Sequence, residues 1–153
     1  MRIPPLRAIA KARGEAGTIA VEAAIILPLL ILLMTGLFDL GFLAYEGIQV
    51  QAAAEAGAQY AARNAWNAAA IADIVTSATG ASGITASPVP SQFCGCPAGG
   101  TLVRVACTAR CADGTLPSVY GEVHAQLEHW TILSYPAVPR PFTVSGKAIT
   151  RVQ

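Results

Sequence analysis

The residues best placed to do chemistry are a small residue, at which the chain could be cut, and an acidic residue that follows it. Both stand just before a long apolar segment. Gly17-Thr18 is followed by Glu22, and a long apolar segment begins at Ala23. An ordinary secretory signal is cut after its apolar segment. The plausible cut here, after Gly17, lies before that segment, so the segment would stay in the product. The new amino group on Thr18 would lie about one helical turn from Glu22. A carboxylate at the mouth of a membrane helix is costly unless it is paired, so we expect a cationic partner for Glu22.

The second chemical feature is a set of four cysteines, all downstream of the apolar segment: Cys94, Cys96, Cys107 and Cys111. If all four pair, three connectivities exist. A bond within Cys94-Gly95-Cys96 would be strained, which favours pairing between the two clusters. We expect the nested arrangement, Cys96 with Cys107 and Cys94 with Cys111. A structural zinc knuckle usually has two-residue spacing within a pair, so the sequence favours disulfides over a metal site.

The sequence offers no pattern for catalysis. His124 and His129 lie in or just after an alternating run, and we expect them to be surface or interface histidines. No serine or cysteine stands at a recognisable motif spacing from a base. Gly99-Gly100 lacks the strand–glycine–helix context of a phosphate loop and is interpreted as a turn. We therefore expect neither an enzyme nor a bound cofactor.

Composition and charge indicate a membrane-anchored chain. The 153 residues are 54% hydrophobic and 12% charged, with a net charge of +1, which excludes the basic footprint of a nucleic-acid-binding protein. Before the apolar run, only Glu15 opposes the basic residues Arg2, Arg7, Lys11 and Arg13. Positive charge on this short flank keeps it in the cytoplasm. The rest is then delivered across the membrane to an oxidising compartment, where disulfides persist.

The apolar segment predicts one membrane-spanning helix over residues 23–44, about 33 Å long. Pro28 lies within it, and membrane helices tolerate proline when the freed carbonyl is satisfied locally. Asp39 falls near the outer interface. Its carboxylate either reaches interfacial water or contacts a neighbouring helix.

The helix is expected to continue beyond the membrane, so that it covers residues 18–66. Alanine, the best helix former, dominates the later part, and proline is missing from 45–66. Small residues recur there at spacings of three and four: Ala53, Ala54, Gly57, Ala58, Ala61, Ala62 and Ala65. Such a stripe either packs on this chain's own sheet or lets a neighbouring helix approach closely.

Residues 67–153 predict a small α+β domain. A helical period over 68–78 ends before Gly80 and Gly83. Alternating runs over 102–107, 119–128 and 142–149 predict strands of an antiparallel meander with one buried face. A further edge strand is expected near 84–89, whereas 130–141 is a proline-rich connection. The fold class is thus α+β, a long helix followed by a second helix and a three- to four-stranded antiparallel sheet.

These residues resemble the TadE-like family, minor pilin-like proteins (pseudopilins) of the tight-adherence, or Flp, pilus system. The resemblance rests on the basic leader 1–17, the Gly17-to-Glu22 junction, the run 20–30 with its Leu27-Pro28, Asp39, and the alanine-rich stretch 51–62. It covers residues 14–66 most specifically. Thr18 stands where major type IV pilins favour phenylalanine.

The resemblance implies a pilin-like substrate of the prepilin peptidase, held in the bacterial inner membrane and feeding a pilus assembly platform. Glu22 would then pair with the amino terminus of an adjacent pilin or pseudopilin, and Asp39 is the second expected assembly contact. Further partners would be membrane lipid and the platform itself, with no nucleic acid. The product either enters the extracellular fibre or stays at its base. The alternative function is an uncleaved, membrane-anchored periplasmic scaffold of the same machinery.

Overall fold

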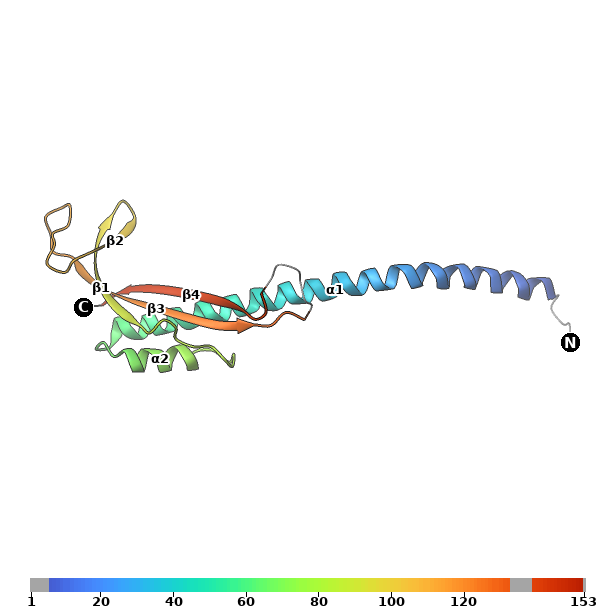
Figure 1. Ribbon diagram of the computed structural model, residues 1–153, viewed down its shortest axis with the longest axis horizontal. Helices are drawn as coiled ribbons and strands as arrows, with labels where there is room; N and C mark the ends of the chain where they lie inside the picture. Colours follow the sequence, from blue (N-terminus) through green and yellow to red (C-terminus); the bar gives the residue numbers. More distant parts are fainter. Residues whose placement is uncertain (1–5, 133–138, 153) are drawn as a thin grey trace. The chain divides into compact units, whose positions relative to one another are not determined.

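The computed structural model describes residues 6–132 and 139–152 of the chain (Figure 1). The chain divides into two units, Met1–Leu40 and Gly41–Gln153. The first is built on helix α1, Leu6–Arg63, which also enters the second unit. The second unit adds helix α2, Ala68–Ser77, and four strands: β1, Ser91–Ala98; β2, Thr101–Val105; β3, Ser118–His129; and β4, Phe142–Arg151. The predicted α+β class is confirmed.

Helix α1 is longer at its start and shorter at its end than the sequence predicts. It begins at Leu6 rather than near Thr18 and continues through Pro28. Residues 6–16 contain four alanines and three basic residues, which favour helix. It ends at Arg63 rather than Trp66. Trp66 leaves the helix and packs over Gly121 of β3, where a Cβ on that glycine would lie only 2.6 Å from the indole ring.

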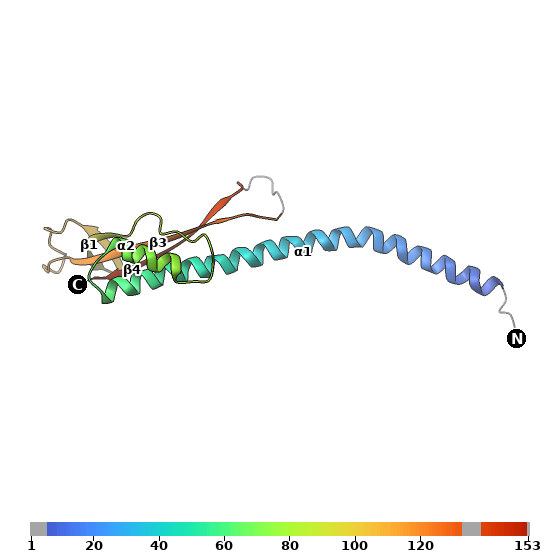
Figure 2. The same cartoon turned by 90° about the horizontal axis from the view of Figure 1, so that it is seen from below.

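Helix α2 begins at a side-chain cap. The Asn67 side-chain oxygen accepts hydrogen bonds from the backbone N–H groups of Ala69 and Ala70, at 3.1 and 3.2 Å. Asparagine is a favoured residue at this position because it satisfies donors that lack helical partners. The helix ends at Ser77 and buries Ile71 and Val75, as its predicted period requires. It lies alongside the C-terminal part of α1 (Figures 1 and 2).

The sheet is fully antiparallel, but it is not a meander. Its strand order is β2-β1-β3-β4, so the chain leaves β2 and passes β1 before it forms β3. The difference arises from β1, which the sequence pattern did not predict because Gly95 and Pro97 interrupt its alternation. The hairpin between β1 and β2 closes at Gly99-Gly100, both with positive φ, which confirms the predicted turn and suits a two-residue hairpin.

The expected edge strand near 84–89 does not form. Only Thr85 pairs with β3, through two backbone hydrogen bonds of 2.9 Å with Gln126, and two prolines follow. The predicted connection over 130–141 has no strand at its described ends, and residues 133–138 of it lie outside the described part of the chain.

The core lies between the sheet and the two helices. Gly57 on α1 shows the packing: a Cβ there would lie 2.6 Å from Val75 of α2 and 2.9 Å from Val123 of β3. Both helices therefore cover the same face of the sheet. The small side chains of α1 face this core, which confirms packing on the chain's own sheet for Ala53, Ala54, Gly57, Ala58 and Ala61. Ala65, at the end of the predicted stripe, is exposed.

The two disulfides join Cys94 to Cys107 and Cys96 to Cys111, with Cα–Cα distances of 5.1 and 5.5 Å. All four predicted cysteines are paired, but the expected nested connectivity is wrong. Strand register explains the outcome. Cys94 lies opposite Val105, two residues before Cys107, whereas Cys96 lies opposite Val103. A nested bond would have to span about four residues of strand, roughly 13 Å.

Candidate assembly site and polar clusters

The first unit exposes apolar side chains around its helix. Large residues such as Ile25, Leu32 and Leu37 are 72%, 61% and 70% exposed. The stretch Gly17–Arg63 is long and apolar enough to cross a membrane, and it is the one such helix within the described residues. Exposed apolar surface of this extent needs an apolar environment. The helix is consistent with a single-pass membrane protein.

The junction residues lie consecutively on α1. Gly17, Thr18 and Glu22 are all exposed. Positions four apart on a helix are neighbours on one face, so the Glu22 carboxylate lies one turn from Thr18, in the direction of the apolar segment. The arrangement can present a carboxylate to a second chain at the very start of the lipid-like surface.

Asp39 is not brought to this junction. It lies about 26 Å farther along α1 than Glu22 at the usual helical rise. Unlike the apolar residues around it, Asp39 is buried, with 5% of its surface exposed. A buried carboxylate needs polar or charged partners. The environment of Asp39 therefore differs from that of Glu22, whose side chain is exposed.

A polar contact that the sequence pattern did not predict joins α1 to β3. The Nδ1 atom of His129 lies 2.6 Å from an Oε atom of Glu46, and the imidazole packs against the Phe142 ring at 5.0 Å. His129 is 3% exposed, so the expectation of a surface histidine is wrong there. The alternation of β3 contained the signal, because His129 shares the parity of the buried Val123 and Leu127.

A second cluster lies on the sheet face opposite the helices. Glu122 of β3 is ion-paired with Arg104 of β2 and with Lys147 of β4, the latter at 2.5 Å, and His124 lies 3.3 Å away. Burial raises the pKa of Glu122, but hydrogen bonds from Lys147 and Arg104 outweigh that effect and lower the pKa to about 2. Its carboxylate thus links three strands and stays ionised at neutral pH.

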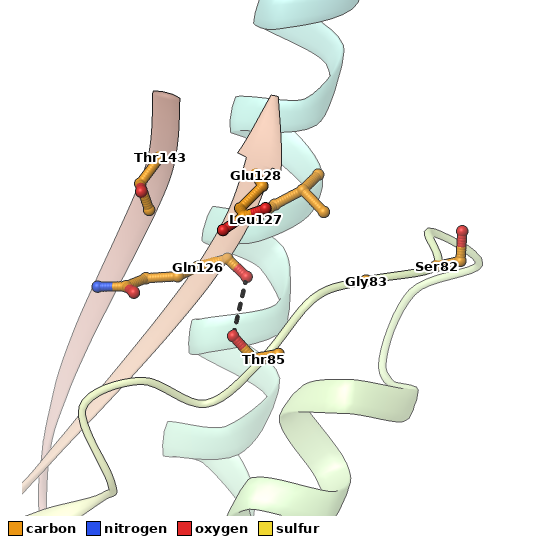
Figure 3. Close-up of a pocket in the computed structure, with 7 residues that line it drawn as sticks. All are labelled: Ser82, Gly83, Thr85, Gln126, Leu127, Glu128 and Thr143. Carbon is orange, nitrogen blue, oxygen red and sulfur yellow. Dashed lines mark hydrogen bonds between the residues drawn. The ribbon is translucent and has the colours of Figure 1, made fainter. Parts of the chain in front are cut away.

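A shallow pocket of about 350 Å³ lies between β3, β4 and the segment after α2 (Figure 3). It is lined by Ser82, Gly83, Thr85, Gln126, Leu127, Glu128 and Thr143. The Thr85 hydroxyl donates to the backbone carbonyl of Gln126 at 3.5 Å, and Glu128 supplies the one charge in this lining. Among the described lining residues, the Ser82 side chain lies apart from Glu128 (Figure 3). Among the side chains described, those of residues 17–132 and 139–152, no three His, Cys, Asp or Glu residues converge as metal ligands.

Comparison with known proteins adds one match, and it falls on the segment that holds the junction. No curated protein and no solved structure matches the chain. Residues 17–65 match a family model described as TadE-like protein. The matched segment starts at Gly17, includes Glu22 and Asp39, and ends two residues after α1. The resemblance inferred from the junction, the apolar run and the alanine-rich stretch is therefore confirmed: residues 17–65 of this chain match the TadE-like family.

Proposed function

We propose that the protein is a minor pseudopilin that takes part in assembling a tight-adherence (type IV-like, Flp) pilus for surface attachment, after prepilin peptidase cuts between Gly17 and Thr18. The observation that carries the proposal is Glu22. It is an exposed carboxylate at the start of an exposed apolar helix, four residues after Thr18 and within the TadE-like match.

The leader, the junction and the apolar helix have successive roles in this proposal. The basic leader holds the N-terminus in the cytoplasm while the helix anchors the subunit in the inner membrane. Cleavage then removes the leader charges and creates an ammonium group on Thr18. Glu22 is costly in lipid unless it is paired, and the Thr18 ammonium of an adjacent subunit is a suitable partner. Pairing between subunits would thus favour assembly over isolated subunits in the bilayer.

The second unit is the part that would lie in the periplasm. Its core depends on small side chains, and domains of this size gain much from disulfides. The two disulfides tie the segment after β2 back to β1. The partners in this proposal are the peptidase, other pilins and pseudopilins, the assembly platform and membrane lipid.

One observation favours the alternative function, an uncleaved anchored scaffold of the same machinery. Helix α1 is continuous from Leu6 through Gly17 and Thr18. A peptidase needs its scissile bond in an accessible, extended form, so the helix would have to unwind at the junction before the cut. A chain that kept its leader would still anchor the second unit in the membrane.

The proposal is tested by Glu22→Ala, with Glu55→Ala as the control. Glu55 is an exposed carboxylate on the same helix, beyond the apolar segment. We expect E22A to insert into the membrane normally, since it loses a charge that lipid disfavours, but to lose cross-links to other pilus subunits and to reduce piliation. E55A should retain both. Cross-links and pili at the unmodified level in E22A would contradict the assembly role and favour the scaffold.

A further inference from the structure

The segment that follows β3 exposes two large apolar side chains. Trp130 is 63% exposed and Ile132 is 58% exposed, whereas Thr131 between them is 6% exposed. A residue that precedes β4 holds the backbone of this segment: the Arg140 guanidinium donates a hydrogen bond to the Thr131 carbonyl at 2.5 Å. Trp130 and Ile132 are therefore presented outward from an anchored stretch of chain.

The place of this segment along α1 is fixed by the residue just before Trp130. His129 contacts Glu46 at 2.6 Å, so the end of β3 lies beside the part of α1 around residue 46. The sequence predicts that the membrane span ends at residue 44. One residue of helix advances about 1.5 Å, which places the contact within a few ångströms of the predicted membrane boundary.

The helix carries matching side chains at the same level. Tyr45 is 59% exposed and Ile48 is 70% exposed, although both lie beyond the predicted span. Tryptophan and tyrosine concentrate at membrane–water interfaces, where the ring meets the acyl boundary and its polar atom meets water. An exposed Trp130 and an exposed Tyr45, held near one level by the half-buried contact between His129 and Glu46, fit that environment.

We propose that the second unit makes its own contact with the membrane that α1 spans: Trp130 and Ile132, together with Tyr45, lie in the lipid headgroup region on the periplasmic side. This inference rests on the membrane span in the proposed function. It adds a second attachment, contributed by a segment far from the span in sequence. Its consequence is a fixed height of the β3–β4 end of the sheet above the bilayer.

The test uses the full chain in phosphatidylcholine–phosphatidylglycerol vesicles, with and without phosphatidylcholine brominated near the headgroup. Only protein that floats with the vesicles is measured. The chain has two tryptophans, and Trp66 packs over Gly121. Subtracting the emission of Trp130→Phe from that of the unmodified chain reports Trp130 without altering Trp66. The emission of W130F itself, which comes from Trp66, is the matched control.

We expect Trp130 emission to be blue-shifted and quenched by the brominated lipid, while the Trp66 emission of W130F is unchanged. Equal Trp130 emission in both vesicles would overturn the inference. Quenching that appears only when each vesicle holds one chain would also overturn it. In vesicles that hold several chains, a second copy of the chain, and not lipid, would then be what covers Trp130. Protein that does not float would instead contradict the membrane span in the proposed function.

Discussion

His129 at the end of β3 and Glu46 on α1 are joined by a 2.6 Å contact between Nδ1 and an Oε atom. The two sides of the contact differ in burial, since the His129 side chain is 4% exposed and that of Glu46 is 28% exposed. Losing the glutamate therefore leaves a buried polar ring without its partner, whereas water can still reach the glutamate side. The contact fastens the β3–β4 end of the sheet to α1.

Glu46→Ala should lower the free energy of unfolding of the second unit by about 1–3 kcal/mol, the cost of an unsatisfied buried polar group. Glu55→Ala, on the exposed face of the same helix, should change it by less than about 0.5 kcal/mol. Denaturant unfolding of the full chain in detergent micelles measures both. Equal effects of the two substitutions would show that the contact contributes nothing specific.

Gly57→Ala should destabilise the core, because its Cβ would lie 2.6 Å from a Val75 methyl and 2.9 Å from a Val123 methyl. Overpacking of this kind costs about 1–3 kcal/mol. Gly47→Ala is the matched control on the same helix, since a Cβ there meets nothing within 4 Å. It should stabilise by about 0.5–1 kcal/mol through helix propensity alone. Thermal unfolding of both variants should move in opposite directions, and a stabilised G57A would contradict the described packing.

Glu122 should make the second unit sensitive to acid. Its pKa is lowered from 4.5 to about 2, so the folded chain binds the proton less readily than the unfolded chain. The resulting stabilisation is fully present above pH 4.5 and is lost as the pH falls through about 2. Arg104 and Lys147 are about half exposed, and solvent screening reduces the effect to about 2 kcal/mol.

Glu122→Gln therefore should remove about 2 kcal/mol at neutral pH and flatten the decline of stability between about pH 4.5 and 2. Glu128→Gln, an exposed position on the same strand, should leave that decline in place. Unfolding curves across this pH range check both. An E122Q variant that keeps the full acid-dependent decline would mean that other carboxylates cause it.

Free-thiol counting on denatured protein should separate the two disulfide connectivities. With Cys94–Cys107 and Cys96–Cys111, the pair of substitutions Cys94→Ser and Cys107→Ser leaves one intact bond and no free thiol. Cys94→Ser with Cys111→Ser breaks both bonds and leaves two free thiols. The opposite result would restore the nested pairing. Each bond closes a loop with a sequence separation of 13 or 15, which is worth about 3 kcal/mol.

The helices and three strands could be predicted from the sequence because local periodicity and composition decide them. The alternation over 119–128 predicted β3 closely, and the helical period over 68–78 predicted α2. The strand β1 could not be found this way, since Gly95 lies beneath Leu102 and Tyr120. That close packing, rather than local pattern, accounts for the glycine inside a strand.

The candidate site, too, could be predicted from the sequence only in part. Gly17, Thr18 and Glu22 follow from spacing along one helix, so the sequence alone arranges them. The pairing of Cys94 with Cys107 depends on the register between β1 and β2, and the Glu46–His129 contact joins residues far apart in the chain. Both need the tertiary fold. Expecting His129 at the surface overlooked its parity with the buried residues of β3.

The intact mass of the protein from native membranes tests the central claim most directly. We predict a mature chain that begins at Thr18 in cells with active prepilin peptidase. Gly17→Leu should retain the leader, because a bulky side chain obstructs the small-residue position, while the neighbouring Ala16→Gly should still be cut. A chain that begins at Met1 in cells with active peptidase would contradict processing, and with it the pseudopilin role.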